Sequence, residues 1–220
     1  MYPKHKCPLC GKEVISKINE SGKYKEKYLD GQHKMPFDVF MSMYHLCPRC
    51  GLVYVFYGTG TLFVSDAVKD IVLSEQYQKI SHNKNVPNNL KLLMLIEQIA
   101  KAREIIGQDI NWLYLRYYEE QRDFVNIDKY LQKVINDIEA GLFFHTNLYE
   151  GETGCKFNGK MIMSKNIVLI DLNRRLKRFN KAQEYINLVK QTANYNTNHP
   201  LQQYVAVQQK LIENQIHRHI

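Results

Sequence analysis

The chain has 220 residues, of which 45% are hydrophobic and 24% charged, and its formal net charge is +8. This composition is typical of a globular protein and excludes a disordered chain, because 15 tyrosines and 9 phenylalanines would not remain solvated. The sequence shows neither an apolar stretch long enough to span a bilayer nor an apolar segment behind its basic N-terminus. We therefore expect a cytoplasmic protein without a membrane span, whose cysteines bind metal or stay reduced.

Two copies of a CPxCG pattern, Cys7–Gly11 and Cys47–Gly51, stand near the start of the chain. A CxxC spacing places two sulfurs on one side of a tight turn, as tetrahedral zinc coordination with bonds of about 2.3 Å requires. The Pro presets the φ angle of the turn, and the Gly accepts a positive φ that lets backbone amides point at the sulfurs. Four thiolates leave no open coordination position, so the sequence predicts one structural zinc ion bound by Cys7, Cys10, Cys47 and Cys50.

A redox-active CxxC is the alternative, but it needs one copy at the start of a helix, whereas here two copies share the same Pro and Gly offsets. Three histidines near the knuckles, His5, His33 and His45, are surplus to a site of four thiolates, so we expect surface or packing roles for them. Cys155 lies far along the chain in a polar stretch, and we expect a free thiol there.

Short β-prone runs at residues 40–46 and 52–57 flank the second knuckle and predict the two strands of a zinc-ribbon hairpin. The 36 residues between Cys10 and Cys47 exceed what a minimal ribbon needs, and the polar run 24–33 predicts an inserted hairpin or loop. We expect a zinc-ribbon domain over residues 1–60 and a helical domain over residues 61–220.

Apolar residues at helical spacing predict about seven helices in the rest of the chain. Ser65 is the expected N-cap of the first, which runs to about residue 80, and the Gly-containing stretch 146–160 predicts a loop. The other helices are expected at 87–106, 108–122, 127–144, 161–176, 180–195 and 201–217. The predicted fold class is mainly α: a small N-terminal β zinc ribbon followed by an all-helical body of antiparallel hairpins.

Helix pairs of about 34 residues indicate tetratricopeptide-like hairpins. Trp112 and Leu115 fit the start of one such unit, and Ala182 fits the small residue in the second helix of another. Lys177 stands where the repeat usually has Gly, and the aromatic residue expected at Asn173 is missing. A plain helical bundle is therefore the alternative.

Together these features resemble a family of uncharacterised bacterial proteins, common in Firmicutes, that is defined as a domain of unknown function. That family pairs an N-terminal CPxCG…CPxCG zinc ribbon with a tetratricopeptide-like helical domain. The last of the matching stretches looks like the family's L-x-E-L-x-R-R-L-G region, with Lys177 replacing the Gly. The matching stretches are residues 6–11, 46–53, 112–118 and 169–185. The resemblance implies a fold and a zinc ion, and it implies no activity.

The sequence is compatible with three classes of function, of which a non-enzymatic interaction module is favoured. In this interpretation the helical hairpins offer a groove to a protein or peptide partner. Tyr114 and Tyr118 share one face of a helix and are the candidates for that surface. Trp112 and Leu115, also at helical spacing, are expected in the core instead.

Nucleic-acid binding through the zinc ribbon and basic patches is the alternative, because both ends of the chain are basic. The net charge is +4 over residues 1–50, −3 over residues 51–150 and +7 over residues 151–220. A basic cluster at a predicted helix end is the candidate surface, with Arg174, Arg175, Arg178 and Lys181. Cations at a helix C-terminus also interact favourably with the helix dipole, and lysines outnumber arginines by 22 to 8, so the cluster has a structural explanation too.

An enzyme is the least favoured class. The sequence has no HExxH motif and no phosphate-binding GK[ST] loop. The neighbouring carboxylates of Glu119 and Glu120 diverge on a helix, and so they do not form a converging acid–base pair. We therefore expect no catalytic residues.

Overall fold

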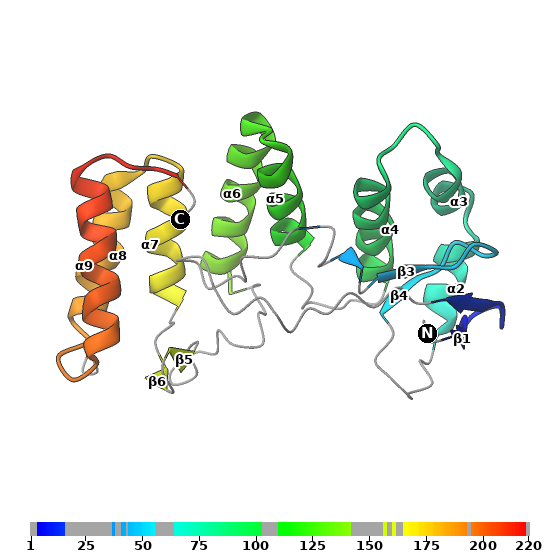
Figure 1. The fold of residues 1–220 in the computed structure, drawn as a ribbon, viewed down its shortest axis with the longest axis horizontal. Coiled ribbons are helices and arrows are strands. Elements are labelled where there is room, and N and C mark those ends of the chain that lie inside the picture. The colour runs from blue at the N-terminus through cyan, green and yellow to red at the C-terminus, as the bar shows by residue number, and fades with distance from the viewer. Residues whose placement is uncertain are drawn as a thin grey trace. The chain divides into compact units, whose positions relative to one another are not determined.

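The computed structural model describes residues 4–15, 37, 41–42, 44–55, 64–102, 110–141, 156–157, 160–161, 165–192 and 195–218 (Figure 1). Over these residues the protein is mainly helical, as predicted. They form two compact units: described residues up to Gln121 belong to the first, and those from Arg122 onwards to the second. The predicted domain boundary at residue 60 lies outside the described residues and stays a prediction.

Two short antiparallel hairpins carry the CPxCG knuckles in the first unit. The strands are β1 (Lys4–Lys6) with β2 (Glu13–Ile15), and β3 (Tyr44–Leu46) with β4 (Val53–Val55). Their registers match, because His5 pairs with Val14 in the first hairpin and His45 pairs with Tyr54 in the second. The β-prone runs predict the second hairpin, but Met41, inside the first run, is helical and the strand begins only at Tyr44. The first hairpin has no such signal, because β1 consists of three polar residues.

A single helix is predicted from residue 65 to about residue 80, and the structure has two. Ser74 separates them in an extended conformation with φ −66° and ψ 148°. Its Oγ donates to the carbonyl of Ile71 at 2.7 Å and accepts from the amide of Tyr77 at 3.3 Å, so one side chain ends the first helix and begins the second. The apolar periodicity continues through Ser74, and so it does not reveal that one helix ends there and another begins. Ser65 is the N-cap of the first helix, as predicted.

Among the described residues, four helices follow the hairpins in the first unit, and α4 packs against the other three. The core of this unit contains Trp112 and Leu115, as their helical spacing predicts, together with Leu93 and Leu95 of α4. The helices are α2 (Asp66–Leu73), α3 (Glu75–His82), α4 (Asn88–Ala102) and α5 (Ile110–Gln121).

The second unit is built around α7, which contacts α6, α8 and α9. All residues of α7 from Ile167 to Arg175 are buried. An apolar cluster joins α7 to α8 and α9 through Ile167, Ile170, Ile186, Val189, Leu201 and Val205. The helices are α6 (Phe124–Glu139), α7 (Lys165–Arg175), α8 (Phe179–Lys190) and α9 (His199–Glu213).

A short two-stranded ladder lies where the sequence predicts the end of a loop and the start of a helix. Strand β5 (Lys156–Phe157) pairs antiparallel with β6 (Lys160–Met161). Strands of two residues are too short to show an alternation of apolar and polar residues, so the sequence does not predict them. The mainly α fold class is confirmed, and the tetratricopeptide-like arrangement of the helices stays a prediction.

Lys177, where the tetratricopeptide pattern has Gly, adopts the backbone conformation that favours Gly. Its φ is +59°, and the amide of Arg178 donates to the carbonyl of Asn173 at 2.8 Å, which closes the Schellman motif at the end of α7. A left-handed conformation costs a residue with a Cβ roughly 1–2 kcal/mol. A residue with a Cβ therefore occupies a left-handed position of the kind that usually holds Gly.

Candidate metal centre

The four knuckle cysteines come together at one point of the first unit. Their Sγ atoms all lie within 4.8 Å of one another. The Sγ atoms of Cys7 and Cys50 are 3.7 Å apart, and those of Cys10 and Cys47 are 3.5 Å apart. Bonds of about 2.3 Å to a tetrahedral ion give sulfur–sulfur distances of about 3.8 Å. The predicted ligands are thus brought together by the fold, and they can hold a metal ion.

Each knuckle is the same backbone turn. The amide of the first cysteine donates to the carbonyl five residues later, at 2.8 Å for Cys7 and 2.9 Å for Cys47. The amide of the closing glycine donates back to the carbonyl of that cysteine at 2.9 Å in both turns. Gly11 and Gly51 have φ angles of +69° and +75°. The positive φ that the sequence predicts at these glycines is confirmed.

Burial and backbone amides act in opposite directions on the thiols. Burial raises the pKa of Cys7, although amides of Cys10 and Leu9 that hydrogen-bond its sulfur act to lower it. Burial acts to raise the pKa of Cys10 as well, but the Lys12 amide and the neighbouring sulfurs outweigh it and lower that pKa. Burial raises the pKa of Cys50 far above its ordinary value. Four clustered thiols of this kind need a cation to become thiolates together.

Helix α3 supports the second knuckle through side-chain hydrogen bonds. The buried hydroxyl of Tyr77 donates to the carbonyl of Gly51 at 2.9 Å and accepts from the amide of Val53 at 3.3 Å. The side-chain amide of Gln78 donates to the carbonyl of Cys50 at 3.0 Å. Such contacts orient metal ligands and tune their affinity for the ion. Sequence reasoning placed Tyr77 in a helix but gave neither residue a role, because no local pattern shows what a helix contacts.

An aromatic cluster joins the two hairpins beside the cysteines. The hydroxyl of Tyr54 lies 2.9 Å from Nε2 of His5, and the rings of His5 and His45 have centroids 5.2 Å apart. Burial lowers the pKa of both histidines, so they favour the neutral form. Both therefore pack between the hairpins, as expected for histidines surplus to the site. His33 and Cys155 lie outside the described residues.

The structure corrects the prediction that Tyr114 and Tyr118 offer an exposed aromatic surface. Tyr114 is 5% exposed, and its hydroxyl donates to Oε2 of Glu97 on α4 at 3.0 Å. Tyr118 is half-buried and stacks on Tyr114, with ring centroids 6.4 Å apart. The physical reason is that α5 packs against α4, so this face of α5 is internal.

The predicted basic cluster is also corrected. Arg174 and Arg175 are 0% and 5% exposed, whereas Arg178 and Lys181 are exposed. The exposed pair has partners within the unit: Arg178 donates to the side chain of Gln132, and Lys181 to Oε2 of Glu184 at 2.8 Å. Because every face of α7 is covered, its last two arginines lie inside the unit, and the four cations do not form one surface.

Comparison of the chain with protein-family models, curated proteins and solved structures finds no match. The resemblance to the bacterial zinc-ribbon family therefore stays a prediction. Across the described stretches, none of the helices is both long enough and apolar enough to cross a membrane.

Proposed function

We propose that this protein binds one structural zinc ion through Cys7, Cys10, Cys47 and Cys50, and that its helical part is a non-enzymatic interaction module for a protein or peptide partner. The observation that supports a metal site is the convergence of four Sγ atoms within 4.8 Å, on two knuckles with the same backbone hydrogen bonds. Soft thiolates in a tetrahedral set suit zinc or iron among the common metals. Zinc is favoured because it needs no redox partner and is held in closed four-cysteine sites as a structural ion.

A closed coordination shell leaves the metal no position for a substrate, so its role is to hold the fold. The partner is assigned to the helices because stacked helical hairpins present extended surfaces that bind polypeptides. Nucleic-acid binding stays the alternative, but with Arg174 and Arg175 buried it rests on Arg178 and Lys181 in this region. Absence of binding to random-sequence RNA at about 50 mM salt would remove it.

Elemental analysis of the purified chain tests the metal assignment. We expect about one zinc per chain, and a colourless protein whose cobalt(II) form shows the absorption of tetrahedral thiolate coordination. Cys47→Ser should lose the bound zinc, whereas the matched control Cys155→Ser should keep it. Iron in place of zinc, or full retention of zinc by Cys47→Ser, would contradict the assignment.

A further inference from the structure

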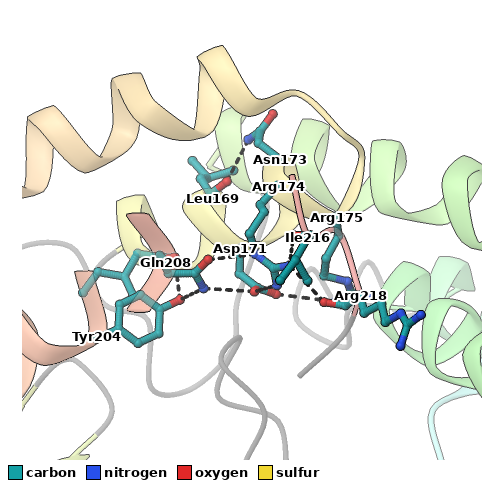
Figure 2. A network of polar contacts seen from close by, with 10 residues as sticks. Leu169, Asp171, Asn173, Arg174, Arg175, Tyr204, Gln208, Ile216 and Arg218 are labelled. Atoms are coloured by element: carbon teal, nitrogen blue, oxygen red, sulfur yellow. Dashed lines mark hydrogen bonds and ion pairs between the residues drawn. The ribbon is translucent and has the colours of Figure 1, made fainter. Parts of the chain in front are cut away.

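A buried polar network links α7 to α9 in the second unit (Figure 2). Asp171, Arg174 and Gln208 are each 0% exposed. Oδ1 of Asp171 accepts from Nη2 of Arg174 at 2.6 Å and from Nε2 of Gln208 at 3.0 Å. Nε of Arg174 donates to Oε1 of Gln208 at 2.9 Å, and Oδ2 of Asp171 lies 3.8 Å from Nη1 of Arg175. Two of the three guanidinium nitrogens of Arg174 are thus bonded to buried side chains.

The third nitrogen of this guanidinium contacts main chain. Nη1 of Arg174 donates to the carbonyl of Ile216 at 2.7 Å and to the carbonyl of Arg218 at 3.0 Å. The two carbonyls belong to the segment that follows α9, and Figure 2 shows both residues beside Arg174. Residues 217 and 218 are exposed, and Ile216 is 37% exposed. The contacts of the segment with this buried cation are made by its backbone.

A strained turn directs the segment to Arg174. Gln215 has a φ of +53°, its amide donates to the carbonyl of Ile212 at 2.9 Å, and the amide of Ile216 donates to the carbonyl of Leu211 at 2.8 Å. Such a Schellman turn reverses the chain after a helix. Because the left-handed region is unfavourable for Gln, the turn depends on the contacts made after it.

We propose that Arg174 is a binding site for the main-chain carbonyl groups of a peptide segment, and that residues 216–218 are its intramolecular occupant, which a partner peptide can replace. Both carbonyls accept from one nitrogen, Nη1, so the segment curves around the guanidinium instead of passing it as an extended strand, whose carbonyls two residues apart lie too far from each other to share one nitrogen. Asp171 counters the charge of Arg174 at 2.6 Å, so neutral carbonyls suit the site better than a phosphate. This names the partner class for the proposed interaction module and rests on that part of the proposed function; the zinc assignment is independent of it.

The first test releases residues 216–218 from Arg174 in the full-length chain. Gln215→Pro removes the amide that bonds Ile212 and forbids the positive φ, whereas the matched control Gln215→Gly allows it. The probe is a fluorescent synthetic peptide of residues 214–220, followed by fluorescence anisotropy. If the segment fills the site nine-tenths of the time, its release lowers the apparent Kd of the peptide about tenfold. We expect this gain for Gln215→Pro and no gain for Gln215→Gly.

A chain that ends at Gln215 is the second variant, because it opens the site without a proline. It should bind the peptide as Gln215→Pro does, with unchanged circular dichroism and zinc content. Failure of both folded variants to bind the peptide more tightly than the full chain overturns the proposal. Because zinc content is measured on the same samples, that failure is distinguishable from failure of the metal assignment.

Changes in the peptide test what the site recognises without disturbing the protein. An ester in place of the amide between residues 216 and 217 weakens the carbonyl of Ile216 as an acceptor, and should weaken binding at least about fivefold. A peptide with alanine at positions 216–218 keeps both carbonyls and should bind within about threefold of the original. The opposite pattern, or displacement of the peptide by low millimolar phosphate, would show a side-chain or anion site and overturn the proposal.

Discussion

The two CPxCG knuckles share one backbone turn but differ in their surroundings. A Cβ added to Gly11 would have no atom of the described residues within 4 Å, whereas one added to Gly51 would lie 2.6 Å from Oγ of Ser81. The second knuckle also receives hydrogen bonds from Tyr77 and Gln78 of the same helix, α3. Its conformation is therefore supported by the helical part of the first unit.

The first knuckle is connected mainly to the second. The hydrogen bond between His5 and Tyr54 and the sulfur cluster itself join the two hairpins. Two sulfurs thus lie on a hairpin supported by α3, and the other two lie on a hairpin that a bound metal ion would help to hold. A shared CPxCG pattern therefore does not give the two knuckles the same support, because the supporting contacts are tertiary.

Substitution of one cysteine ligand is expected to have the largest effect on stability. This effect should differ between the two hairpins. Structural zinc sites contribute roughly 10 kcal/mol or more of apparent binding free energy, so Cys7→Ser and Cys47→Ser should both lose their zinc. In zinc-free Cys7→Ser, amide hydrogen exchange should accelerate strongly over residues 4–15 and less over residues 44–55, which keep their bonds to α3. Equal acceleration in both hairpins would show that α3 gives no such support.

The glycines provide the next test. Gly11→Ala adds a Cβ at positive φ in open space and should lower the free energy of unfolding by roughly 1 kcal/mol. Gly51→Ala adds the clash with Ser81 and should cost about 2–3 kcal/mol in urea unfolding of the zinc-loaded protein. Ser81→Gly, which removes both Oγ and Cβ, should reduce the cost of Gly51→Ala to near that of Gly11→Ala. A double-mutant cycle without coupling would contradict the close contact.

Two tyrosine hydroxyls allow a matched comparison of support. Tyr77→Phe leaves the buried carbonyl of Gly51 and amide of Val53 without this partner, and should cost about 1–3 kcal/mol of stability and about tenfold in zinc affinity. Tyr54→Phe removes the bond to His5 between the hairpins and should cost about 1 kcal/mol. Competition with a chromophoric chelator measures the affinities. A larger loss of affinity for Tyr54→Phe would reverse the assigned order of support.

How far the sequence predicts the molecule depends on whether a feature is local. Cysteine spacing predicts the four ligands, and apolar periodicity predicts most helices, because both signals lie within a few residues. The contacts that Tyr77 and Gln78 make with the second hairpin join residues 24 or more positions apart, so no local pattern contains them. Arg174 has the appearance of a surface cation for the same reason: its burial depends on Gln208 and the segment after α9, more than 30 positions away.

The smallest expected effect measures the free-energy cost of a Cβ at positive φ, which is part of the glycine comparison. Lys177 has a φ of +59°, so Lys177→Gly removes a Cβ at positive φ where Gly11→Ala adds one. Relief of the left-handed strain, offset in part by the greater entropy of Gly in the unfolded chain, should stabilise the protein by about 0.5–1 kcal/mol. The gain should appear in urea unfolding of the second unit, with zinc affinity unchanged. Lys177→Ala is the control, because it removes the charge but keeps the Cβ, and it should give no gain. If Lys177→Ala stabilises as much as Lys177→Gly, the charge of Lys177 and not backbone strain accounts for the gain. The value measured at Lys177 then says nothing about the cost of Gly11→Ala.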